Sequence, residues 1–364
     1  MTKRRWFTVL ALPLLIGAEA VVPNSEDSAT DIEASAIDQR FDPLVDALFN
    51  DEGVGETRAV IVLRDGRVIA ERYAAGYTAD MRYISWSMAK SVTAILIGFL
   101  VEDGRLDLDA PAPIPEWQGA DDPRRAITLR HLLNMASGLD HTEVGDPIWD
   151  SDTNRMLFTG GADDMAGYAV DRPLEAESGA HYEYSSATTV ILSRIIADTL
   201  TNSRDPGVRA AVYRRFAEQR LLGPARIPSV YFEFDAQGTQ IGGSLIHATA
   251  RDWARLGEVM RTGQGPDGAQ IISPQWRAFM LRPSPRNPEY GGHIWLNRPG
   301  GPYESPTLFP GTGPGSIFSF VGHLGQYVVV SPEQAMTVVR LGNTPDGDRR
   351  AVVDRLARFF AENG

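Results

Sequence analysis

The segment from Ser91 to Val101 is the feature that most restricts how this chain can fold. It reads "SVTAILIGFLV", which is apolar on nearly every face of a helix, and the following "EDG" ends it at Gly104. A helix that is hydrophobic all round must be covered on every side by other parts of the protein. The pattern therefore predicts a central, buried helix, and its first turn carries Ser87 and Lys90.

Strand-like segments stand at both ends of the chain, with helical segments between them. Residues 58–74 contain two strand-like runs around Asp65-Gly66, which is a hairpin signal. Residues 316–330 and 335–342 are typical of adjacent antiparallel strands. We therefore predict an α+β fold, with one antiparallel sheet built from both chain ends, flanked by helices, and an inserted mainly helical region.

The same pattern gives domain boundaries in a chain of 364 residues, which is long enough to bury a large core. We expect a sheet domain made of 41–110 and 241–364, and an inserted helical domain over 111–240. In the segment 128–138 we expect Thr128 to be a helix N-cap and Gly138 to stop that helix. Further helices are predicted over 43–49, 185–200, 208–222, 249–263 and 348–362.

The N-terminus has the layout of a secretory signal peptide. Three basic residues precede an apolar run from Trp6 to Ile16, and Ala18-Glu19-Ala20 places small residues at a cleavage site. We interpret 1–20 as the signal peptide and 21–40 as a flexible tether, which predicts a periplasmic or secreted protein with no stable membrane partner. An uncleaved N-terminal anchor is the alternative.

Composition excludes several kinds of chemistry. The chain has no cysteine, so disulfides, thiol catalysis and thiolate metal sites are excluded. Its formal charge of −12 disfavours nucleic acid as a partner. The histidines show no metal-ligand spacing, so we predict no metal and no cofactor.

Lysine occurs at only two positions, Lys3 and Lys90, and every other basic residue is arginine. Arginine stays protonated in proteins, whereas a lysine amine can act as a base once its pKa is lowered. The start of a buried helix lowers that pKa through desolvation and the helix dipole. Because Ser87 and Lys90 are three residues apart, they share a helix face, and the amine could activate the serine hydroxyl. The alternative is that Lys90 is a chance remnant of an arginine-rich composition.

Four segments together resemble one family. "SWSMAKS" at 85–91, "TLRHLLNMASGL" at 128–139, "YSS" at 184–186 and "GHLGQ" at 322–326 are similar to motifs of the class C β-lactamase-like serine hydrolases. Within them the chain looks most like the branch of 6-aminohexanoate-dimer hydrolases and related esterases. The resemblance spans about 41 to 362, with all motifs in the expected order.

The resemblance implies a role for each matched residue. Ser87 is expected to be the nucleophile, Lys90 the base, and Tyr184 the proton donor to the leaving group. The backbone N–H groups of Ser87 and Gln326 are expected to form the oxyanion hole. The matched positions also imply substrate contacts from Ser186, His323 and Gly325.

Two departures from the family pattern bear on the substrate. Ser186 stands where the family's Y-x-N motif has asparagine, and His323 stands where K-T-G has lysine. Both changes remove groups used for β-lactams and D-alanyl peptides, so we predict a small-molecule ester or linear amide as substrate. The alternatives are a D-alanyl-D-alanine carboxypeptidase or β-lactamase, and a non-catalytic envelope binding protein. We also hypothesise that 141–161 forms a lid whose Trp149 and Phe158 contact the substrate.

Overall fold

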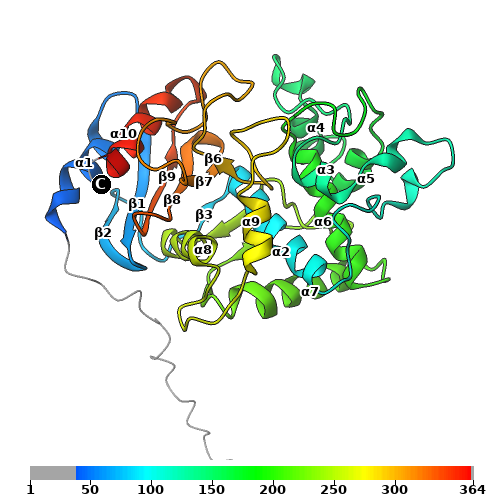
Figure 1. Ribbon diagram of the computed structural model, residues 1–364, viewed down its shortest axis with the longest axis horizontal. Coiled ribbons are helices and arrows are strands. Elements are labelled where there is room, and N and C mark those ends of the chain that lie inside the picture. Colours follow the sequence, from blue (N-terminus) through cyan, green and yellow to red (C-terminus); the bar gives the residue numbers. More distant parts are fainter. Residues whose placement is uncertain (1–37, 362–364) are drawn as a thin grey trace, which may run out of the picture. The chain divides into compact units, whose positions relative to one another are not determined.

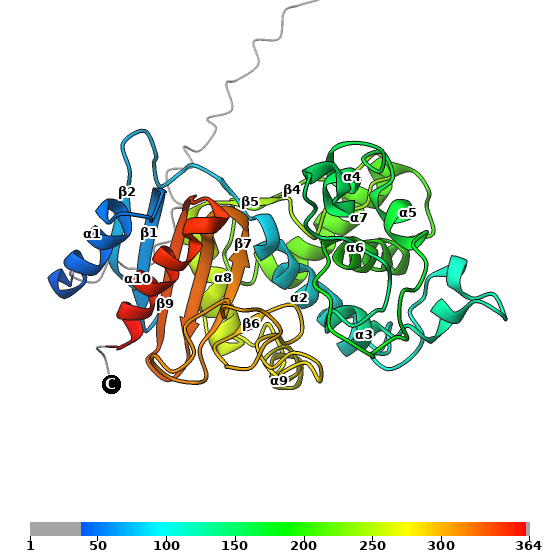
Figure 2. The ribbon, with the colours of Figure 1, turned by 90° about the horizontal axis from the view of Figure 1, so that it is seen from above.

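The computed structural model describes residues 38–361 and contains two antiparallel sheets among ten α-helices in that range (Figures 1 and 2). The larger sheet has six strands in the order β2-β1-β9-β8-β7-β6. Their bounds are β1 (Glu56–Arg64), β2 (Arg67–Tyr73), β6 (Trp295–Leu296), β7 (Phe318–Gly322), β8 (Gln326–Ser331) and β9 (Met336–Asn343). The last strand, β9, lies between β1 and β8, so the sheet joins both ends of the described chain.

Alternate residues of these strands face two separate hydrophobic cores, as the two-residue period of a strand requires. In β1, Ile61 and Leu63 face the core that contains α2 (Ala89–Glu102) and α8 (Ala250–Thr262). Val60 and Val62 face the second core, which is closed by α1 (Asp42–Asn50) and α10 (Arg349–Ala361). The sheet is thus sandwiched between helices, with α1 and α10 on one face and α8 on the other (Figure 2).

The central helix α2 is buried along almost its whole length, as predicted from its sequence. It packs against α6 (Ser186–Leu200), and several of the smaller helices also contact α6 (Figure 2). The remaining helices are α3 (Leu129–Leu133), α4 (Asp152–Phe158), α5 (Met165–Val170), α7 (Pro206–Ala217) and α9 (Pro274–Met280).

Most predicted elements are present, but several differ in detail. The helix after the N-cap Thr128 ends at Leu133 rather than at Gly138, because Asn134 caps it and Met135 turns with a positive φ of 55°. A second sheet, β3 (Tyr83–Ile84), β5 (Ile246–Ala248) and β4 (Tyr231–Phe232), was not predicted, because strands of two or three residues carry no measurable alternation. Residues 39 and 40, inside the segment predicted as a tether, begin a 3-10 helix capped by Asp38.

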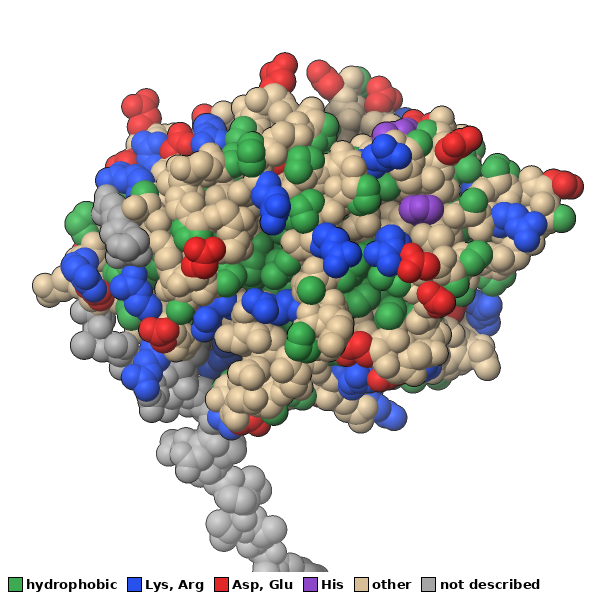
Figure 3. Space-filling model, in the orientation of Figure 1, with side chains coloured by type: hydrophobic (Ala, Val, Ile, Leu, Met, Phe, Trp, Pro, Cys, Tyr) green, Lys and Arg blue, Asp and Glu red, His purple; other side chains and the backbone are tan. Residues whose placement is uncertain are grey.

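The predicted signal peptide and residues 21–37 lie outside the described residues. Over residues 38–361, no helix is long and apolar enough to span a bilayer. Acidic and basic side chains are interspersed on the face shown in Figure 3. Many of the arginines form ion pairs with neighbouring carboxylates, for example Arg251 with Glu71 and Arg194 with Glu116.

Candidate active site

Ser87 lies in a tight turn at the start of the central helix. It belongs to the short 3-10 helix η2 (Trp86–Met88), which runs directly into α2. Trp86 has a φ of 44°, a strained value for a bulky residue, and its ring packs edge-on against His323 with ring centres 5.4 Å apart. A Cβ at Gly322 would overlap the Ser85 carbonyl oxygen, so the turn is pressed against the end of β7.

Lys90 is buried one turn further along and points back to Ser87. Its Nζ lies 2.9 Å from Ser87 Oγ, 2.8 Å from Ser186 Oγ and 2.8 Å from the Gly243 carbonyl oxygen. The side chain is 1% exposed, and this burial lowers the pKa of Lys90 to about 8, against a smaller opposing effect of the Glu143 carboxylate. About one Lys90 amine in ten is therefore neutral at pH 7, and a general base must be neutral to accept a proton.

Glu143, which no sequence motif indicated, reaches the same cluster from the loop before α4. Its Oε1 accepts a hydrogen bond of 2.7 Å from Ser186 Oγ, and its Oε2 accepts one of 2.6 Å from the Ser186 backbone N–H. Thr153 Oγ1 donates to Oε2 at 2.7 Å, and Ser151 Oγ donates to the Glu143 carbonyl oxygen. The loop that was predicted as a lid thus delivers a fixed carboxylate beside Lys90. The one sequence signal for Glu143 as a site residue is its position within the predicted lid, 141–161.

Tyr184 lies beside Lys90 in an aromatic cluster. The Lys90 ammonium is 4.8 Å from the centre of the Tyr184 ring, which stacks on Trp295 and meets Tyr290 edge-on. Burial, followed by the Glu143 carboxylate, raises the pKa of Tyr184 far above its usual value, while hydrogen bonding with Ser87 lowers it slightly. Tyr184 is therefore protonated throughout the neutral range and can donate a proton. Ser185, next in the chain, is the N-cap of α6.

Gln326 begins β8 beside the turn that carries Ser87. The Gln326 side chain is fixed by bonds to Gly342, accepting from its N–H at 2.9 Å and donating to its carbonyl at 2.7 Å. Gly325 has a φ of 79°, and the buried Arg340 donates to its carbonyl oxygen at 2.8 Å. These bonds hold the backbone at Gln326 rigidly, as an oxyanion-binding N–H requires.

Of the predicted site residues, the structure brings together Ser87, Lys90, Tyr184 and Ser186.

The remaining predicted contacts lie further out. His323 is half-exposed and faces Asp346 and Trp86. Trp149 and Phe158 are 66% and 56% exposed, and no described hydrogen bond or ring contact joins them to Ser87. Their proposed contact with substrate stays a prediction.

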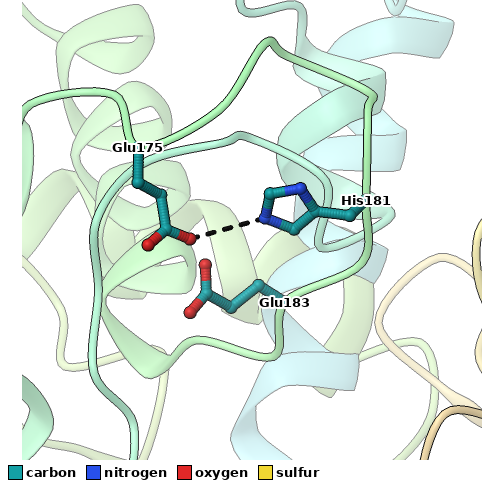
Figure 4. Close-up of side chains that lie close together, drawn as sticks. All are labelled: Glu175, His181 and Glu183. Carbon is teal, nitrogen blue, oxygen red and sulfur yellow. Dashed lines mark hydrogen bonds and ion pairs between the residues drawn. The ribbon is translucent and has the colours of Figure 1, made fainter.

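A second cluster lies in the segment leading to Tyr184. Glu175, His181 and Glu183 point toward one another, with His181 Nε2 3.4 Å from Glu175 Oε1 (Figure 4). Burial, and after it the neighbouring Glu175, raises the pKa of Glu183 to about 8. The groups are close enough to hold a cation, but Glu175 and His181 are exposed, and such clusters are common without one.

Solved structures with the same fold include hydrolases and penicillin-binding-protein homologues. The octameric penicillin-binding protein homologue from Pyrococcus abyssi superposes with a TM-score of 0.64 at 18% identity, covering 88% of this chain and 77% of that one. EstCE1, a hydrolase with promiscuous acyltransferase activity, also gives 0.64 at 18% identity, over 88% of this chain and 97% of that one. This likeness confirms the predicted fold class.

Sequence comparison points the same way. The 6-aminohexanoate-dimer hydrolase of Paenarthrobacter ureafaciens is 27% identical over 300 residues, which cover 81% of this chain and 74% of that protein. The model of the Beta-lactamase family matches residues 38–362, nearly all of the chain beyond the predicted leader and tether. The resemblance inferred from the motifs is therefore confirmed, and the chain belongs to the Beta-lactamase family of hydrolases.

Proposed function

We propose that this protein is a serine hydrolase that cleaves a carboxylic ester or small linear amide through an acyl-enzyme on Ser87. The observation that carries the proposal is the 2.9 Å contact between Ser87 Oγ and the buried, easily deprotonated amine of Lys90. A serine hydroxyl is a poor nucleophile unless a base removes its proton, and Lys90 is the base in reach.

In the acylation step, neutral Lys90 takes the Ser87 proton as Oγ attacks the substrate carbonyl carbon. The new oxyanion would be held by the N–H groups of Ser87 and Gln326. Tyr184, kept protonated by its surroundings, gives its proton to the leaving alcohol or amine and regains one from Lys90. A water molecule then attacks the acyl carbonyl carbon, the same groups pass one of its protons to Ser87 Oγ as the acyl–Oγ bond breaks, and the acid is released.

The substrate class follows from the two family positions that differ. Lysine at the position of His323 would supply a cation for a substrate carboxylate, and the half-exposed imidazole is a weaker partner for one. Where the family's asparagine would offer a free amide to the substrate, Ser186 offers a hydroxyl that already binds Lys90 and Glu143. Uncharged esters and simple amides therefore fit better than β-lactams or D-alanyl peptides. The leader sequence supports action in the periplasm or outside the cell, which the N-terminus of the mature protein would test.

The decisive experiment is covalent labelling with a fluorophosphonate, followed by intact-mass measurement of wild type and Ser87→Ala. We expect one adduct on the wild type and none on the variant. A folded wild type that takes up no label would refute the proposal and favour the binding-protein alternative. Turnover of a chromogenic cephalosporin that exceeds turnover of short-chain esters would instead favour the β-lactamase alternative.

A further inference from the structure

The hydrogen bonds around Lys90 fix the direction in which its lone pair points. A neutral amine has two N–H donors and one lone pair, and Lys90 Nζ has three partners. The carbonyl oxygen of Gly243 can only accept, so it takes one N–H. The question is which of the two hydroxyls, Ser87 or Ser186, receives the other N–H and which faces the lone pair.

Glu143 settles this question through Ser186. A carboxylate can only accept, so the single hydrogen of Ser186 Oγ must point to Glu143 Oε1, 2.7 Å away. Toward Lys90, Ser186 Oγ is then an acceptor only and takes the second N–H. The lone pair of Lys90 is left facing the Ser87 hydroxyl, which is the arrangement that proton abstraction needs.

We propose that Glu143 is a positioning residue: it holds the Ser186 hydroxyl so that the Lys90 lone pair faces Ser87 alone. The inference rests on the proposed serine mechanism, and in it the Ser186 hydroxyl orients the amine of Lys90. Glu143 itself has little freedom, because the Ser186 backbone N–H and Thr153 Oγ1 both bind its Oε2. Without the carboxylate, the Ser186 hydroxyl could turn and donate to Lys90, in competition with Ser87.

Other groups around Lys90 do not supply this orientation. The Tyr184 ring faces the amine with its π surface at 4.8 Å. His293 is buried nearby, but its ring nitrogens are engaged by the Leu133 carbonyl and the Thr189 hydroxyl. Burial, with a smaller effect of the positive charge of Lys90, lowers the pKa of His293 to about 3, so it stays neutral.

The test compares four variants and one control variant of the full chain by ester hydrolysis across pH. In Glu143→Gln, the amide oxygen stays with the two donors at Oε2, so the NH₂ group faces Ser186 Oγ and reverses that bond. In Glu143→Asp, the charge is kept but the shorter side chain no longer reaches Ser186. Ser186→Ala removes the link, and the double variant Ser186→Ala with Glu143→Gln asks whether Glu143 acts through it. Asp150→Asn, an exposed carboxylate of the same loop, is the matched control.

We expect Glu143→Gln and Glu143→Asp to lower kcat by about 10-fold or more on the alkaline plateau, with KM within about 2-fold. The double variant should be no slower than Ser186→Ala, and Asp150→Asn should match the wild type. Melting temperatures identify variants that fail to fold, and Glu143→Asp and Ser186→Ala each test the idea if Glu143→Gln does not fold.

Two results would overturn the inference. One is a plateau kcat of the folded Glu143 variants that equals the wild-type value, with only the pH of the inflection changed. Glu143 would then act only through the effect of its charge on the pKa of Lys90. The other is an undiminished effect of Glu143→Gln in the Ser186→Ala background. A wild type that neither hydrolyses esters or amides nor takes up fluorophosphonate would instead refute the serine mechanism itself, so the two failures are distinguishable.

Discussion

Titrating Lys90 tests the chemical basis of the proposed mechanism directly. Desolvation lowers the pKa of this amine from 10.5 to about 8, a difference worth about 3 kcal/mol. At pH 7 about one amine in ten is then neutral, against fewer than about one in a thousand for an exposed lysine. Burial in α2 thus increases the supply of active base by more than about a hundredfold.

Lysine is rare enough in this chain to make the titration clean. With ¹³C-labelled lysine, the full chain gives signals from only Lys3 and Lys90, and the signal lost in Lys90→Arg identifies the second. We expect that signal to titrate near pH 8 and log(kcat/KM) to rise with unit slope to the same pH before levelling. A Lys90 signal that titrates near 10.5, or a rate profile with no inflection near 8, would refute the reasoning.

Three further predictions follow from the site and its surroundings. Tyr184→Phe keeps the ring packing, so the melting temperature should not change, but it removes the hydroxyl and should lower kcat by about 100-fold. The loss should be larger for alkyl esters than for nitrophenyl esters, whose leaving group needs no proton, and equal losses on both would contradict the donor role. Gly322→Ala places a methyl group against the Ser85 carbonyl, so it should cost about 1–3 kcal/mol in chemical denaturation and reduce kcat; an unchanged enzyme would show that the turn is free to move. The raised pKa of Glu183, to about 8, means that the folded protein holds a proton that the unfolded chain releases, so stability falls as pH rises from about 4.5 to about 8. Glu183→Gln should therefore gain melting temperature over the wild type at pH 8 but not at pH 5, and a gain independent of pH would exclude this cause.

The sequence predicts those elements of the fold and site that depend on residues close together in the chain. The buried helix α2, the hairpin at Asp65-Gly66 and the strands β7 to β9 follow from local periodicity and turn chemistry, and all of them are present. Ser87 and Lys90 meet because three residues make one helical turn.

The position of Glu143 could not be predicted in this way. Forty-three residues separate it from Ser186, and its place depends on the way the loop folds back on Ser151 and Thr153. Neither a sequence motif nor a hydrophobic periodicity indicates that the loop folds back in this way. The same holds for the small sheet β3-β5-β4, whose strands are held by pairing between distant segments.

The central place of β9 in the sheet has a consequence for the order of assembly. Arg340 on this strand donates to the carbonyl oxygens of Val54, near the start of the described chain, and of Gly325, which precedes Gln326. Ser87 is synthesised early, but its surroundings are complete only when one of the last segments of the chain inserts between β1 and β8. Such long-range pairing is slow to form, so a growing or unfolded chain carries Ser87 and Lys90 without a working site. Hydrolytic activity should consequently appear late in refolding, together with the closure of the sheet rather than with the formation of α2.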